Sequence, residues 1–345
     1  MKTFRKLLTV AVLGGLMTTA YSADKVLKVA SWLPTTHDIN AELWPTVKKE
    51  LEKRTDGRVS LEVEYGLAPP NGLLELIEYE SADISWTFNG YFPGRFTTTK
   101  MIELPGYPGS SEAASYAHWK AHEKFFKKAG EYEGVKLIGL MVHAPADLLM
   151  NDKSKIQSLG ELKGRKMRTA GGVANEVAQA LKVSPILAPA SKSYEMISGG
   201  MADGTFLPMG TVALFRLYEV APNAYTVPGG FYRGSFSIFM SPSALDGVSE
   251  ADKKTINEYF GEKLSVDGGK VWDKLYQGGA EKFTKHGKIT PLAEADVKQF
   301  TEMTQSIKDK VIKEVSAKGI DGQAAYDFIY ETMKNYKPAD AKADK

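Results

Sequence analysis

The chain reads Leu162-Lys163-Gly164-Arg165-Lys166-Met167-Arg168 near its middle, and Gly171-Gly172 follows. This stretch predicts a strand that runs into a glycine turn. A helix is then predicted over 173–181, an apolar stretch at Ile186-Leu187, and another helix before Gly199-Gly200. Strands that alternate with helices in this way indicate a parallel α/β sheet.

A similar unit is predicted nearer the N-terminus. Residues 26–29 are mostly apolar and predict a buried strand. Asp38 is a plausible N-cap. After it, apolar residues recur every four positions over 39–51, which predicts a helix. Alternation over 59–65 and the run 84–88 predict two further strands. The chain is therefore expected to carry two α/β units side by side.

Two later segments stand apart from these units. Residues 236–240 alternate like a strand that returns toward the first unit. From Ser249, a hydroxyl with an acid three residues on, a helical pattern continues to about His286. Glycines at 261, 268, 269, 278 and 279 are expected to weaken or bend it. A helix of this length exceeds what one small domain needs.

The first 22 residues predict a secretory signal. A short basic start precedes an apolar stretch from Leu7 to Met17, and small residues follow up to Ala20-Tyr21-Ser22. The apolar stretch is shorter than the roughly 20 residues that span a bilayer. We therefore expect the mature protein to be soluble and to work in the periplasm.

Composition excludes several classes of function. The chain has 345 residues, 43% hydrophobic and 25% charged, as expected for globular domains. Three of its 44 basic residues lie in the first 22 residues, which contain no acidic residue. The other 41 basic residues nearly balance the 42 acidic ones, so no basic excess is left to bind nucleic acid. The absence of cysteine excludes a disulfide framework, a metal–thiolate site and a lipoprotein anchor.

Several segments together resemble the periplasmic solute-binding proteins of tripartite ATP-independent periplasmic (TRAP) transporters, the DctP-like family. They are the stretch 162–168, Tyr194-Glu195, Ala202-Asp203-Gly204 ahead of Pro208, and 90–96 with Glu103-Leu104-Pro105. The resemblance covers nearly the whole mature chain. It implies a two-domain α/β periplasmic binding protein fold with a ligand cleft and a long domain-spanning helix. It also implies a small organic acid as ligand, membrane-embedded TRAP permease subunits as partners, a monomer, no cofactor, no metal and no catalysis.

This architecture gives the following expected division of the chain. We predict a signal peptide over 1–22, domain I over 23–142 with 236–275, domain II over 143–235 with 276–336, and a flexible tail over 337–345.

The resemblance places Arg168 at the cleft, where its guanidinium would hold a ligand carboxylate through two parallel hydrogen bonds. The chain departs from the family pattern twice. It has Thr205-Phe206-Leu207-Pro208 where many members have Gln-Glu-Asn-Pro, and it has no second arginine in 143–147. Both departures remove polar partners, so the expected ligand is a monocarboxylate with an apolar or aromatic body. A C4-dicarboxylate or a sugar acid is the alternative.

The other candidate ligand contacts are mostly aromatic. Several sit at strand ends, where open α/β sheets bind ligands. Aromatic residues are more often core, and Arg95 fits a structural ion pair better than a second anion contact. The predicted ligand contacts besides Arg168 are Trp32, Phe88, Asn89, Tyr91, Arg95, Phe206 and Tyr232.

Two other classes of protein share single features with this sequence. A metal-dependent hydrolase could use His118 and His122, four apart on a predicted helix, but no glutamate lies between them and no third ligand is evident. The binding protein of an ATP-driven transporter would share the cleft but lack the Arg168 strand and the spanning helix.

Overall fold

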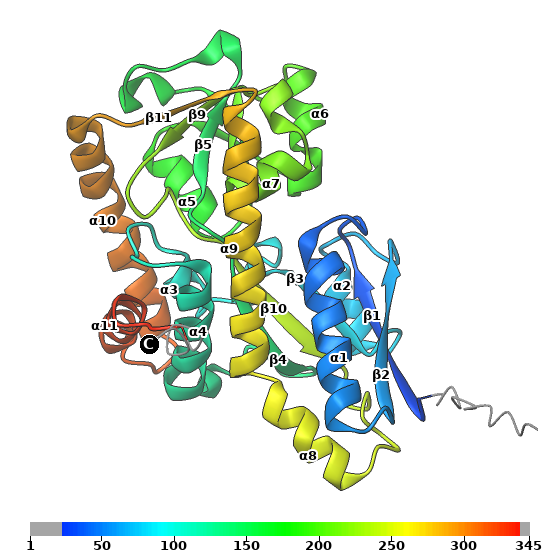
Figure 1. Ribbon diagram of the computed structural model, residues 1–345. Helices are drawn as coiled ribbons and strands as arrows, with labels where there is room; N and C mark the ends of the chain where they lie inside the picture. Colours follow the sequence, from blue (N-terminus) through cyan, green and yellow to red (C-terminus); the bar gives the residue numbers. More distant parts are fainter. Residues whose placement is uncertain (1–22, 339–345) are drawn as a thin grey trace, which may run out of the picture.

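The computed structural model describes residues 23–338, which form two α/β units (Figure 1). The signal peptide predicted over 1–22 lies outside these residues, as does most of the predicted tail. Within residues 23–338, none of the helices is long and apolar enough to cross a membrane.

The first unit is built on a five-stranded sheet. Its order is β2 (Val59–Tyr65), β1 (Lys25–Ser31), β3 (Ile84–Phe88), β10 (Ser235–Met240) and β4 (Lys136–Val142). β1 lies parallel to β2 and β3, whereas β10 lies antiparallel between β3 and β4. The strand predicted over 236–240 therefore does return to the first unit.

The second unit is built on a six-stranded sheet. Its order is β11 (Lys288–Pro291), β9 (Asn223–Thr226), β5 (Asp147–Met150), β8 (Gly204–Leu207), β6 (Lys166–Thr169) and β7 (Ser184–Leu187). β6, the strand predicted from 162–168, lies parallel to β7 and β8. Residues Leu159–Leu162 form a short 3₁₀ turn instead, so the strand is shorter than the stretch.

Helices pack on both sheets and between the units. They are α1 (Trp44–Arg54), α2 (Leu73–Glu78), α3 (Lys100–Glu103), α4 (Ser111–Ala121), α5 (Val173–Ala180), α6 (Ser193–Ser198), α7 (Met209–Leu214), α8 (Glu250–Tyr259), α9 (Glu262–Thr284), α10 (Glu294–Ser316) and α11 (Gly322–Lys334). The helix predicted after Asp38 begins with a π-helical turn, Ile39–Leu43, and continues as α1.

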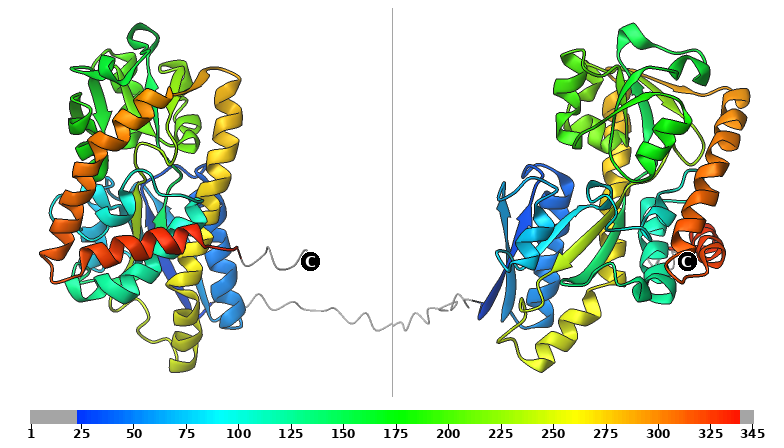
Figure 2. Two further views of the ribbon diagram at one scale, coloured as in Figure 1. Left: turned by 90° about the vertical axis from the view of Figure 1, so that its left-hand side faces the viewer. Right: turned by 180° about the vertical axis from the view of Figure 1, so that it is seen from behind.

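The chain crosses between the units several times. α9 runs along both, contacting α4 and β4 of the first and α7 of the second (Figure 1). α10 descends from the second unit to the first, where α11 packs against α4 and α3 (Figure 2). The two-domain fold with a long spanning helix is thus confirmed. The sequence-based division of the chain, which groups α11 with domain II, stays a prediction.

The helical pattern from Ser249 to His286 forms two helices rather than one. Gly261 separates α8 from α9 with a φ of +91°, which side-chain-bearing residues rarely adopt, and a Cβ there would overlap the Trp119 ring. The other glycines lie inside α9. They were expected to weaken the helix, but Gly269 and Gly279 instead let backbone of α4 and α7 approach closely.

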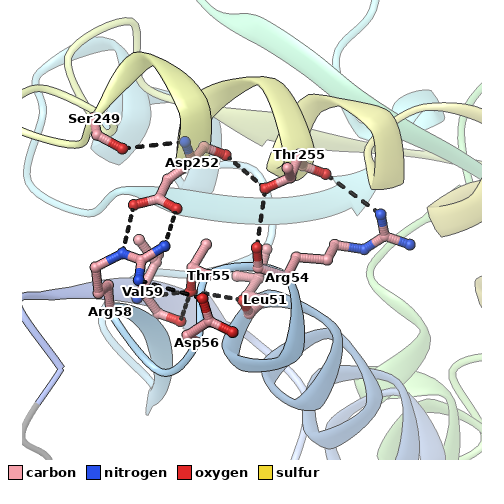
Figure 3. A network of polar contacts seen from close by, with 9 residues as sticks. All are labelled: Leu51, Arg54, Thr55, Asp56, Arg58, Val59, Ser249, Asp252 and Thr255. Carbon is pink, nitrogen blue, oxygen red and sulfur yellow. Dashed lines mark hydrogen bonds and ion pairs between the residues drawn. The ribbon is translucent and has the colours of Figure 1, made fainter.

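Polar contacts hold α8 to the turn between α1 and β2 (Figure 3). Arg58 Nε and Nη2 donate to the two carboxylate oxygens of Asp252 at 2.9 and 2.7 Å. Ser249 Oγ accepts from Asp252 N at 3.1 Å and caps α8, as its sequence predicts. These contacts fix the start of the segment that leads into α9.

Candidate functional site

A pocket with about 430 Å³ of empty space, part of it open to solvent, lies where the two units meet. Almost all of its lining is apolar or aromatic. The first unit and the crossing segments contribute Trp32, Leu33, His37, Phe88, Tyr91, His143, Tyr232, Phe236 and Trp272, and the second unit contributes Arg168, Ala170, Ala190, Leu207, Thr211 and Phe215.

Arg168 lies on β6 and is fully buried. Its Nε and Nη2 both donate to the carbonyl oxygen of Ala188, at 2.9 and 2.6 Å. Its Nη1 is buried and has no hydrogen-bond partner among residues 23–338. An arginine stays charged, and a buried charged donor without an acceptor is costly. The pocket therefore presents a positive group that an anionic ligand would satisfy.

Two tyrosine hydroxyls accompany this arginine. Burial raises the pKa of Tyr232, and the nearby charge of Arg168 opposes that rise. The Tyr91 hydroxyl accepts from Ala190 N at 3.1 Å, so its own hydrogen is available to donate. Tyr91 can therefore donate to an anion beside Arg168, whereas the Tyr232 hydroxyl donates to Phe206 O at 3.5 Å.

Aromatic rings form the walls around the rest of the pocket. The Phe236 and Trp272 rings stack with centroids 5.1 Å apart, and Phe88 meets Tyr91 edge to face at 5.0 Å. The Trp32 ring lies 6.1 Å from Tyr91. Such walls suit a flat apolar group, which gains from both burial and ring–ring contact.

Charge in the pocket is limited to one side chain. Arg168 is the one lysine, arginine, aspartate or glutamate among the described residues that line it. The two lining histidines are neutral at pH 7, because burial lowers the pKa of His37 to about 3 and that of His143 to about 4. The site is thus matched to a ligand with a single negative charge.

Five of the residues predicted as ligand contacts line this pocket together. They are Trp32, Phe88, Tyr91, Arg168 and Tyr232. Leu207, noted in the sequence only as a departure from the family pattern, lines it as well.

The other three predicted contacts lie outside the pocket. Asn89, directly after β3, donates to Ser235 Oγ at 3.0 Å and accepts from Ser237 Oγ at 2.8 Å. These two hydrogen bonds connect the end of β3 to β10. Phe206 faces the core against Phe231, with ring centroids 5.4 Å apart.

Arg95, the third of them, pairs with Glu78 at 2.9 Å and donates to Glu133 O at 3.0 Å. This is the structural ion pair that the sequence left open as its alternative role.

Several residues that line the pocket were not predicted from the sequence. Trp272 lies within α9 and reaches the pocket only because that helix runs past both units, so nothing local marks it. His37 lies in the loop after β1. Open α/β sheets bind ligands at such strand ends, so its position was a signal in the sequence.

A second buried arginine, Arg233, was also missed, and it lies outside the pocket lining. Its Nη2 donates to Gly109 O at 2.6 Å. Burial lowers its pKa to about 10, which leaves it charged at neutral pH.

The histidine pair of the metalloenzyme alternative does not form a metal site. His118 lies on the buried side of α4, and burial lowers its pKa to about 3. Across residues 23–338, no group of three or more His, Cys, Asp or Glu side chains is placed to hold a metal ion.

Comparison with known proteins identifies the family. Residues 31–314 match the family model for bacterial extracellular solute-binding proteins, family 7. The chain belongs to this family. It is a TRAP periplasmic solute receptor, and its family and its structural neighbours are solute-binding proteins rather than enzymes.

Three similar proteins illustrate the relationship. A TRAP periplasmic solute-binding protein of Bordetella bronchiseptica, solved with (R)- and (S)-mandelate, is 30% identical, with a TM-score of 0.87 over 90% of this chain and 98% of that one. A marine metagenome TRAP protein specific for aromatic acids, solved with 3-hydroxybenzoate, is 25% identical, with a TM-score of 0.84 over 92% and 100%. The outer membrane transporter protein TsaT of Comamonas testosteroni is 26% identical over 94% of this chain and 96% of that one.

Proposed function

We propose that this receptor binds an aromatic monocarboxylate through Arg168 in the periplasm, as a monomer, and delivers it to membrane-embedded TRAP permease subunits. The observation that carries the proposal is the buried, unpartnered Arg168 Nη1 in a pocket whose walls are aromatic. A carboxylate at Arg168 would also receive a hydrogen bond from the Tyr91 hydroxyl, which accepts from Ala190 N and keeps its own hydrogen to donate. Periplasmic location follows from the family and from the predicted leader over 1–22.

The lining disfavours the more polar alternatives. A C4-dicarboxylate would bring a second charge, yet Arg168 is the single cation of the described lining. A sugar acid would bring several hydroxyls, and each one buried without a partner costs about 1–3 kcal/mol. Leu207 stands where many family members offer an amide, so the lining supplies fewer such partners.

The relatives point the same way. The similar proteins solved with mandelate and with 3-hydroxybenzoate bind aromatic monocarboxylates.

Isothermal titration calorimetry with a panel of acids tests this proposal. Purified mature protein should bind phenylpyruvate, indole-acetate or mandelate with measurable heat, and succinate and a hexuronate at least a hundredfold more weakly. Tight binding of succinate or the hexuronate, with no aromatic acid bound, would overturn it.

A further inference from the structure

The turn between β6 and α5 touches the first unit backbone to backbone. A Cβ on Gly171 would overlap the carbonyl oxygen of Gly90, and beyond the chain neighbours the three atoms nearest to it all belong to Gly90. A Cβ on Gly172 would overlap Oε2 of Glu103, the same oxygen that accepts from Val173 N at 3.1 Å. This turn of the second unit therefore meets two segments of the first with no room for a side chain between them.

Gly171 is required for space and not for its backbone conformation. Its φ lies outside the left-handed region, so an alanine could adopt the same backbone without strain. Gly172 differs, because its φ of +64° favours glycine whatever the space around it. The requirement for glycine at residue 171 therefore comes from the approach of the other unit.

This contact borders the pocket. Ala170 and Tyr91, which are chain neighbours of the two touching glycines, both line it. The Tyr91 hydroxyl accepts from Ala190 N at 3.1 Å. Two residues earlier, Ala188 O accepts from the Arg168 guanidinium. A hydroxyl of the first unit and the cation of the second thus hold the same short segment.

We propose that the contact between Gly90 and Gly171 sets how far the two units close. Only with no side chain at residue 171 can the Tyr91 hydroxyl then reach a carboxylate at Arg168. Tyr91 directly follows Gly90, so a methyl group that keeps the two backbones apart withdraws the hydroxyl as well. The inference deepens the proposed function and rests on it, because the carboxylate must lie at Arg168.

Calorimetry tests this with whichever of phenylpyruvate, indole-acetate and mandelate the wild-type protein binds most tightly. Tyr91→Phe keeps the ring and removes one hydrogen bond to a charged group, so affinity should fall by about 10-fold to 150-fold. Gly171→Ala should lose at least as much, although its hydroxyl is still present. The double variant should bind like Gly171→Ala alone, because the hydroxyl that it lacks no longer reaches the ligand.

Small-angle X-ray scattering measures the closing itself, without ligand and with that acid at saturation. Wild-type protein should reach a smaller radius of gyration than Gly171→Ala. The matched control is Gly160→Ala in the same unit, where the nearest atom to the Cβ beyond the chain neighbours is Ser158 Oγ at 3.8 Å. This control should keep the wild-type affinity and radius. Thermal unfolding of each variant checks that it folds.

The outcomes separate the two proposals. A Gly171→Ala protein that closes as far as wild type would overturn the inference, and so would a double variant in which the two losses multiply. A Gly171→Ala protein that no longer unfolds cooperatively would overturn it too, because the contact would then belong to the fold itself. If wild-type protein binds none of the three acids, the proposed function fails. Scattering without ligand then decides the inference: equal radii overturn it, and a larger radius for Gly171→Ala supports it.

Discussion

His118 shows what complete burial does to a single ionisable residue. Neither ring nitrogen has a hydrogen-bond partner in the described structure, and burial lowers the pKa to about 3. The native ring is therefore neutral over the whole physiological range, whereas in the unfolded chain it takes up a proton near pH 6.5. A histidine of this kind stabilises the fold fully above pH 6.5, and that stability is lost as pH falls toward 3.

Replacing His118 with leucine, which has a similar volume, should flatten this pH dependence. Between pH 7.5 and pH 5, the wild-type free energy of unfolding should fall by about 2 kcal/mol more than that of His118→Leu. Urea unfolding at the two pH values measures the difference, and His286→Leu at an exposed position is the control. Equal losses in wild type and His118→Leu would mean that the native ring can be protonated.

Helix α9 shows how one element serves both units. Gly279 packs against α7 so closely that a Cβ would overlap the carbonyl of Met209, whereas apart from the chain neighbours and nearby backbone of α9, no described atom lies within 4 Å of the Cβ position at Gly278. The two glycines are adjacent in the sequence but differ in purpose. One is required by packing, and the other costs helix stability without a packing reason.

The substitutions Gly279→Ala and Gly278→Ala should therefore have opposite signs. Gly279→Ala should destabilise the protein by about 1–3 kcal/mol, because α7 and α9 must separate. Gly278→Ala should stabilise it by up to about 1 kcal/mol through helix propensity and a less flexible unfolded chain. Denaturant unfolding measures the change in stability for both variants. Equal changes would contradict the close contact between α7 and α9 at Gly279.

The strands could be predicted better than the site. β1, β2, β3 and β6 follow from local alternation and apolar runs, which depend on neighbours in sequence. The glycines of α9 were interpreted as weak points because the helices that press on them come from elsewhere in the chain. His37 and Trp272 were missed for the same reason, while Arg168 was predicted only through the family resemblance.

The two units touch each other beside the pocket. Glu103 of the first unit accepts from Val173 N at 3.1 Å, the first residue of α5 in the second. Lys100 and Glu176 pair across the same boundary at 3.1 Å. Together with the Tyr91–Ala190 hydrogen bond, these contacts close the two units over the space beside Arg168. Arg168 itself is fully buried, so a carboxylate paired with it would be shielded from water, which strengthens its pairing with the guanidinium.

The most direct test is the affinity of the tightest-binding aromatic acid for Arg168→Ala, measured by calorimetry beside wild type. Removing the guanidinium would leave a buried carboxylate without its partner, at a cost of about 2–5 kcal/mol, so affinity should fall by about 30-fold to 5,000-fold. Lys166→Ala, at an exposed position on the same strand, should bind like wild type. An Arg168→Ala protein that unfolds cooperatively and still binds within threefold of wild type would contradict the account.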